Sequence, residues 1–248
     1  MTHPPTHTVE MQELGINLIA LDFRPPMLNL DVLKFSGIIP NEWELAQEPM
    51  MTPTRVQLSF SNGVSLIAQP RQVTVLQATA VPPNQAKPEI PQIAQRYVEQ
   101  FPRADYQGLS FAPKVLVGFP TNTEAAREFI TGQLLGGGAW QQLGHAPLQA
   151  SVTLNYQLKR CPLTIAISEV KLNQQEQQIS ALLFAGAFNY TIPENYRDRR
   201  SDYLSKRIGK WSTDLVQFSE VVHRKFLNTG SNTGRSTATS VFPELEES

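Results

Sequence analysis

Short runs of alternating hydrophobic and polar residues recur along the chain, and the first of them predict a β-hairpin. In residues 55–60 and again in residues 64–69, every second residue is hydrophobic. A period of two is typical of a strand with one buried face. The two runs flank Asn62-Gly63, a dipeptide that favours a two-residue type I′ turn because both of its positions need positive φ. We therefore expect a hairpin here, with a third strand at residues 73–75.

Five further segments have the composition of strands. Residues 16–23 begin the part of the chain that we expect to be ordered, and the hydrophobic residues 27–35 that follow predict either a short helix or a packed irregular segment. Pro113 falls within the strand predicted for residues 109–119 and favours a bulge or an edge position, because proline lacks the N–H that a ladder needs. Three strands in series complete the set, at residues 149–158, 163–172 and 178–190.

Three segments predict helices. In residues 90–101, Pro91 falls in the first turn, where a missing N–H does no harm. Residues 121–135 open with Thr121 and Glu124 at the spacing of a capping box and end at three consecutive glycines. The longest predicted helix covers residues 201–227, and one hydrophobic stripe runs down its length, wide enough to cover a sheet. The residues of this stripe are Leu204, Ile208, Trp211, Leu215, Phe218 and Val222.

The order of these elements predicts an α+β protein with mainly antiparallel sheet, covered by helices, and with the long C-terminal helix packed on the sheet. The series of one strand, a helical segment, three strands and a helix occurs twice. We interpret it as a tandem β-α-βββ-α pseudo-repeat; the alternative is coincidence, since residue identity between the halves is slight. The order resembles that of helix-grip and TATA-box-binding-like folds, but a likeness of layout does not transfer function.

The same elements divide the chain into four parts. Residues 1–14 are polar and rich in proline, and residues 229–248 are rich in glycine, serine and threonine with an acidic end, so we expect both to be disordered. Between them, residues 15–103 form the first half of the predicted pseudo-repeat. Residues 104–228 form the second half, which includes the long helix.

Charge and composition narrow the class of protein. The 248 residues are 41% hydrophobic and carry a formal net charge of -1, so no global basic field attracts nucleic acid. No stretch approaches the roughly 20 apolar residues of a membrane-spanning helix, and the first residues lack the apolar core of a signal peptide. We expect a soluble, cytoplasmic protein without membrane insertion.

No motif of a known catalytic chemistry is present. Cys161 is the single cysteine and precedes a proline among strand-like residues, which favours a buried thiol over a nucleophile. The four histidines are scattered, so we expect no metal site. The glycine-rich residues 132–138 follow a predicted helix instead of preceding one, so they are interpreted as a helix end and not as a phosphate loop. We therefore predict no enzyme activity and no cofactor.

A basic cluster at the start of the last predicted helix is the one candidate contact site. Arg199, Arg200, Lys206 and Lys210 belong to it, and two tyrosines lie among them. Such a pattern suits phosphate contacts combined with base stacking. The alternative, which we favour, is a solvated helix face whose cations pair with neighbouring aspartates.

Three functions remain open. The first is a non-enzymatic binding or scaffold protein that uses a sheet face or edge for a protein partner or for self-association, since unpaired edges are often managed by pairing. The second is a nucleic-acid-associated protein that uses the basic cluster. The third is a small-molecule-binding protein with a pocket between the sheet and the long helix, lined by Trp211 and Phe218. The C-terminal Phe242-Pro243-Glu244-Leu245 has the composition of a docking peptide or of a solubilising tail.

Overall fold

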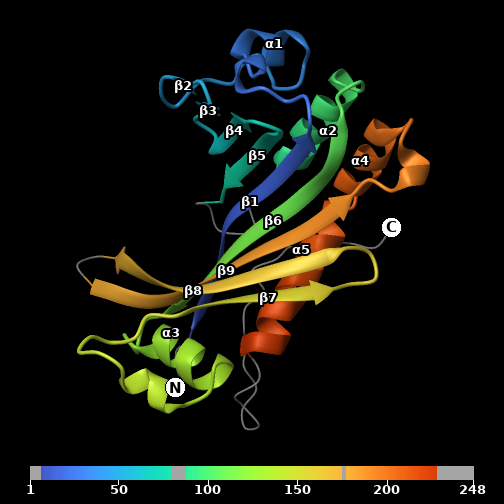
Figure 1. The fold of residues 1–248 in the computed structure, drawn as a ribbon. Coiled ribbons are helices and arrows are strands. Elements are labelled where there is room, and N and C mark those ends of the chain that lie inside the picture. Colours follow the sequence, from blue (N-terminus) through green and yellow to red (C-terminus); the bar gives the residue numbers. More distant parts are fainter. Residues whose placement is uncertain (1–6, 80–87, 175–176, 228–248) are drawn as a thin grey trace, which may run out of the picture.

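Two long antiparallel strands, β1 and β6, run through the middle of a nine-stranded sheet (Figure 1). The computed structural model describes residues 7–79, 88–174 and 177–227. Every neighbouring pair of strands is antiparallel, in the order β2-β3-β4-β5-β1-β6-β9-β8-β7. The strands are β1 (Thr8–Ala20), β2 (Met50–Thr52), β3 (Arg55–Ser59), β4 (Val64–Gln69), β5 (Gln72–Ala78), β6 (Tyr106–Phe119), β7 (Ser151–Gln157), β8 (Pro162–Gln174) and β9 (Gln177–Thr191).

Helices lie on one face of this sheet, which confirms the predicted α+β class (Figure 1). The described α-helices are α1 (Leu30–Phe35), α2 (Ile90–Gln100), α3 (Ala125–Glu128), α4 (Arg200–Ile208) and α5 (Trp211–Glu220). The short 3-10 and π segments are η1 (Pro25–Met27), η2 (Phe129–Leu134), η3 (Ala139–Gln142), η4 (Glu194–Tyr196) and η5 (Val221–Leu227). Helix α2 packs on β1 and β5, and helices α4 and α5 pack on β6.

The hydrophobic stripe of the last predicted helix packs on the sheet as expected, but the helix is not continuous. Gly209 and Lys210 separate α4 from α5, and the backbone of Lys210 (φ -104, ψ 15) leaves the helical region. The stripe survives this break because both helices turn it toward the sheet, where Leu204, Phe218 and Val222 are fully buried. The sequence pattern therefore identified the buried face and missed the break at the glycine.

The predicted hairpin exists, but its turn is not type I′. Ser59 pairs with Ser65, which leaves a three-residue loop with Phe60 and Val64 at its base. Only Gly63 has positive φ (82°), whereas a type I′ turn needs positive φ at two positions. A three-residue loop whose last residue, Gly63, has left-handed backbone angles joins the same two strands. The hairpin therefore forms without the predicted type I′ turn.

Pro113 lies in a central strand and not at an edge. It faces Leu14 of β1, and the ladder between β6 and β9 has no pairs at residues 112 and 113, although its register is unchanged on either side. The bulge falls on the neighbouring strand, where the register shifts between Met11 and Glu13. The missing N–H of proline is thus tolerated by an interruption of one ladder.

The capping box predicted for the helix after β6 does not form. Helix α3 begins three residues later than that motif requires, with Glu124 instead of Thr121 at the N-cap, and Glu124 makes no side-chain capping bond. Instead the Asn122 side-chain oxygen accepts a bond of 2.9 Å from the Glu124 backbone N–H. The glycines after η2 do end the helical segment, and Gly136 has positive φ (71°).

The topology places the two predicted halves in one sheet. Strand order is β2-β3-β4-β5-β1 on one side of the centre and β6-β9-β8-β7 on the other. The first half therefore contributes one central strand and four that follow it, and the second half contributes one central strand and three. The duplication itself stays a prediction. Strand β1 begins at Thr8, so residues 8–14, which we expected to be disordered, pair with β6. The predictions for residues 1–6 and 229–248 lie outside the described residues.

Within the three described ranges, none of the helices has the length and apolar character that a membrane crossing requires.

Candidate functional site

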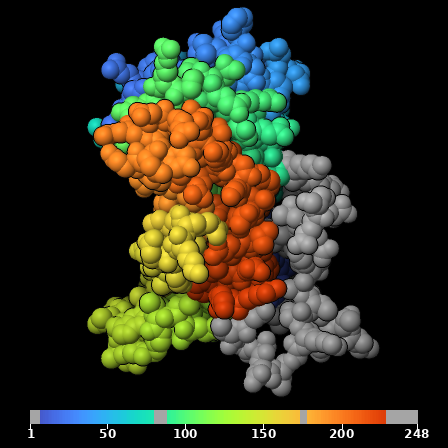
Figure 2. Space-filling view, turned by 90° about the vertical axis from the view of Figure 1, so that its right-hand side faces the viewer, coloured from blue at the N-terminus to red at the C-terminus, as the bar shows by residue number. Residues whose placement is uncertain are grey.

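Of the four residues in the predicted basic cluster, one is ion-paired within the protein and three are exposed. The guanidinium of Arg200 binds the Asp105 carboxylate and donates a bond of 2.8 Å to the Tyr106 carbonyl oxygen. These contacts attach α4 to the start of β6, which gives Arg200 a structural role. Arg199, Lys206 and Lys210 are exposed. Figure 2 shows α4 (orange) and α5 (red) at this surface.

A neighbouring cation, Arg207, is also used for packing. Its guanidinium carbon lies 5.3 Å from the ring centre of Tyr190 and 5.1 Å from that of Tyr203. Stacking of this kind stabilises a partly buried arginine by roughly 0.5–2 kcal/mol. Two arginines of the basic segment are therefore held by the protein itself, and fewer cations remain for phosphate contacts than the sequence suggested.

Sequence reasoning missed a buried polar network behind this surface. Asp214 of α5 is 2% exposed and accepts a bond of 2.8 Å from Arg160 Nε, and the Tyr190 hydroxyl donates to the same carboxylate at 2.9 Å. Arg160 lies in the turn between β7 and β8, so the network joins that turn, β9 and α5. One indication of this network is visible in the sequence: Asp214 directly precedes Leu215 of the hydrophobic stripe.

The network has the chemistry of an anchor and not of a nucleophilic site. Burial raises the pKa of the Tyr190 hydroxyl well above its usual range and raises the pKa of the adjacent Cys161 thiol. Both groups therefore stay protonated at neutral pH, and a protonated thiol is a poor nucleophile. The cysteine is buried, as its position in the sequence predicted.

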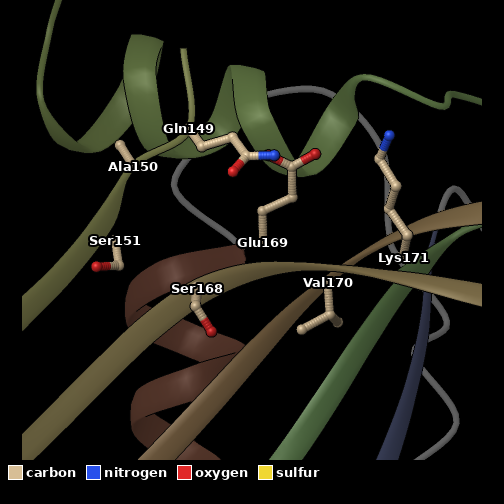
Figure 3. A pocket seen from close by; sticks show the side chains of 7 residues that line it. All are labelled: Gln149, Ala150, Ser151, Ser168, Glu169, Val170 and Lys171. Atoms are coloured by element: carbon tan, nitrogen blue, oxygen red, sulfur yellow. The ribbon is translucent and has the colours of Figure 1, made fainter. Parts of the chain in front are cut away.

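A polar cleft opens where the chain enters β7. It consists of two adjoining hollows of about 450 and 680 Å³, and Gln149, Glu169 and Lys171 line both. Figure 3 shows Glu169 and Lys171 on one side of β8 and Ser168 and Val170 on the other, with the Gln149 side chain directed toward Glu169.

The groups in this cleft do not form a catalytic arrangement. His145 and the ion-paired Arg127 and Glu124 line its outer part. Among the described residues, no group of three or more His, Cys, Asp or Glu side chains could hold a metal ion. The cleft offers hydrogen-bonding groups, two acidic side chains and two basic ones, which suits contact with a polar surface.

The most unusual surface lies at the other end of the sheet, around α1 and β2. Phe35 is 96% exposed and Met51 is 69% exposed, and α1 and β2 lie at the same end of the molecule (Figure 1). Three more apolar side chains of this region are exposed. We call the five together the α1–β2 surface: Met27, Val32, Phe35, Met50 and Met51.

The local sequence holds this surface open. The Asn29 side chain caps α1 by accepting bonds from the backbone N–H groups of Asp31 and Val32. Leu33 faces inward and is 1% exposed. Val32 and Phe35 lie on the other sides of the helix and face outward. Because apolar residues occur on both the buried and the exposed sides of this short helix, the hydrophobic pattern of residues 27–35 could not distinguish a helix from a packed irregular segment.

Acidic residues predominate in the segment that carries the α1–β2 surface. Between residues 27 and 51 the chain carries four acids and one lysine, which is a net charge of -3. Glu42, Glu44 and Glu48 are exposed, and the Lys34 ammonium donates a bond of 2.9 Å to the Asn41 carbonyl oxygen. The segment between α1 and β2 therefore exposes three acidic side chains close in sequence to the apolar ones.

At the junction that the small-molecule alternative uses, Phe218 packs directly on the sheet. Phe218 is fully buried, and its ring lies over Gly186 of β9, where no side chain intervenes. A hollow of about 430 Å³ occurs elsewhere, beside Met27, where Phe23, Tyr97 and Phe101 line it. It adjoins the α1–β2 surface and lies away from α5.

Comparison of the sequence with protein-family models and with curated proteins finds no match.

Proposed function

We propose that this protein is a non-enzymatic binding protein that engages a protein partner through the α1–β2 surface, at one edge of the sheet. The observation that supports this most strongly is the 96% exposure of Phe35 on a capped, ordered helix. Water contact with an aromatic side chain is unfavourable by about 25 cal/mol per Å² of apolar surface. Such a residue gains free energy when a partner covers it.

The composition of the surface is that of an interface centre. Phenylalanine and methionine are enriched in protein interfaces, and methionine adapts its shape to irregular partners. Met50 and Met51 lie on the outermost strand, whose side chains are exposed throughout. We infer that Phe35 is the central anchor and that the methionines pack around it.

The charges and the neighbouring hollow define the kind of partner. A protein with an apolar pocket for Phe35 and a basic rim would match the acidic residues in the segment that carries the α1–β2 surface. The hollow beside Met27 could in turn accept one bulky apolar side chain of that partner, because aromatic rings line it. The partner we propose is therefore a protein whose surface is apolar at its centre and basic at its margin.

Site-specific photo-crosslinking tests this proposal. A photoreactive phenylalanine derivative would replace Phe35 in cells that naturally make the protein, and the same derivative at exposed Gln133 on η2 would serve as the control. We expect a discrete adduct at position 35 that Met51→Ser reduces and that position 133 does not give. Equal, diffuse labelling at both positions would refute the proposal.

The nucleic-acid alternative is left with Arg199, Lys206 and Lys210, because Arg200 is held by Asp105. Lys206 lies in α4, and Arg199 and Lys210 lie just outside its two ends. Exposed cations in such positions are typical of a solvated face. No observation favours this alternative over the protein-binding function.

A further inference from the structure

Strand β7 forms the second edge of the sheet, opposite β2, and it is seven residues long (Ser151–Gln157). Among the described residues it pairs with β8 alone. Its outer side therefore presents backbone N–H and C=O groups that a further strand can bind.

Nothing in the strand blocks such pairing. Natural edge strands are protected by charged side chains, proline, bulges or shortness. Residues 151–157, Ser-Val-Thr-Leu-Asn-Tyr-Gln, contain no charged residue, proline or glycine, and the register with β8 has no shift. The opposite edge, β2, is only three residues long and is followed by Pro53, so it has the protection that β7 lacks.

The apolar side chains of β7 are also incompletely covered. Val152 and Leu154 are half-buried and Tyr156 is 40% exposed. These three residues are opposite the buried Ile167, Ile165 and Leu163 of β8 and so share the face that carries the helices. A strand added to β7 would continue that face and bury them further.

We infer that β7 pairs with β7 of a second copy of this chain, antiparallel and centred on Leu154. This register is self-complementary. Leu154 lies opposite its own copy, Val152 opposite Tyr156, Thr153 opposite Asn155, and Ser151 opposite Gln157. Aromatic residues opposite β-branched ones are favourable cross-strand pairs, each polar residue meets a polar residue, and no like charges face each other.

A two-fold axis normal to the sheet produces this pairing, and the contact is closed because it uses β7 of both copies. The two sheets become one of eighteen strands, with helices on the same side. The α1–β2 surfaces then lie at its two far ends, because β2 and β7 are the opposite edges of each sheet. The dimer would present two partner-binding surfaces and gain avidity for a multivalent partner.

Charge substitutions at Thr153 and Asn155 test both the dimer and its register. Both side chains are exposed, so the substitutions perturb folding little. In Thr153→Lys with Asn155→Lys, two lysine pairs face each other across the axis, and in Thr153→Lys with Asn155→Glu, two ion pairs face each other. The matched control is Thr52→Lys with Thr54→Lys, which adds the same charge at the opposite edge.

Sedimentation equilibrium measures the mass of each variant against the 27.7 kDa of one chain. We expect twice this mass for the wild type, the control and the Lys-Glu variant, and the single mass for the Lys-Lys variant. A single mass for the wild type at millimolar concentration would overturn the inference. So would a monomeric Lys-Glu variant beside a dimeric wild type, because that result excludes this register.

A disulfide provides a direct check on the same pairing. In Thr153→Cys with Asn155→Cys, each new thiol lies opposite one of the second copy. Their Cβ atoms would be about 4.5–5.5 Å apart, so a small approach of the two strands brings them within the roughly 3.5–4.5 Å of a disulfide. We expect a covalent dimer on oxidation, and none from Thr153→Cys alone. A covalent dimer from the single variant would contradict the register. Phe35→Ser with Met51→Ser should leave the dimer unchanged, which separates this inference from the proposed partner surface.

Discussion

The ring of Phe218 in α5 occupies the space directly over Gly186 of β9. A Cβ atom at Gly186 would stand 2.6 Å from Phe218 Cε2 and 2.8 Å from Cδ2. The glycine therefore allows a close approach between α5 and the sheet. A second ring contact continues this packing along β9: the ring centres of Phe226 and Phe184 are 5.5 Å apart.

Gly186→Ala should destabilise the protein by about 1–3 kcal/mol, because an added methyl group forces a buried ring out of its place. Gly132→Ala is the control, since nothing lies within 4 Å of the Cβ position there. It should be neutral or slightly stabilising, because alanine restricts the unfolded chain. Urea unfolding of both variants measures the difference, and equal free energies of unfolding would contradict the packing described here.

The hydrophobic pattern predicted most of this architecture for a physical reason. Strands and helices with one buried face carry a period in the sequence, and residues such as Val56 and Phe218 show that period clearly. Turn type, caps and breaks depend on one or two residues instead. Asn62-Gly63 fits two loop lengths equally well, and Gly209 can lie inside or between helices, so the sequence alone could not decide either.

Asp214→Ala should lower the free energy of unfolding by about 1.5–3 kcal/mol. The substitution leaves the Tyr190 hydroxyl and the Arg160 guanidinium without their shared acceptor, and hydrogen bonds to a buried charged group are of this strength. Glu220→Ala, which removes an exposed ion pair with Arg224, should cost no more than about 0.5 kcal/mol. If thermal unfolding shows that both substitutions lower the free energy of unfolding equally, the Asp214 network does not stabilise the attachment of α5.

Tyr106→Phe should leave stability at neutral pH unchanged or raise it by up to about 1 kcal/mol. The Tyr106 hydroxyl is buried and has no hydrogen-bond partner among the described residues, so its removal leaves no group unpaired. Its ring contact with Phe23, with ring centres 5.7 Å apart, does not need the hydroxyl.

The same variant should be less sensitive to alkaline pH. Burial, with the charges of Tyr97 and Asp22, raises the pKa of Tyr106 above the value of 10.0 of an unperturbed tyrosine. A raised folded-state pKa contributes stability that is fully present below about pH 10 and is lost as the pH rises further. Unfolding at pH 8 and pH 11 should show a smaller loss in Tyr106→Phe than in the wild type; an equal loss would place the titration elsewhere.

The candidate sites were less predictable than the fold. The charge cluster at residues 199–210 was visible in the sequence, but whether a cation is free depends on distant partners such as Asp105, which no local pattern reveals. The exposure of Phe35 was hidden for the opposite reason. A hydrophobic residue is expected to be buried, and only the orientation of α1, set by Leu33 and Asn29, turns Phe35 outward.

The most direct test of the central claim compares what co-isolates with the wild type and with Phe35→Ser, Met51→Ser in cells that naturally make the protein. Because both side chains are exposed, the double variant should keep its stability within about 0.5 kcal/mol. Quantitative mass spectrometry should then show one or more proteins that the double variant loses and that the exposed-site control Lys206→Ser, Lys210→Ser retains. An identical set of proteins for the wild type, the double variant and the control would contradict a binding function at the α1–β2 surface.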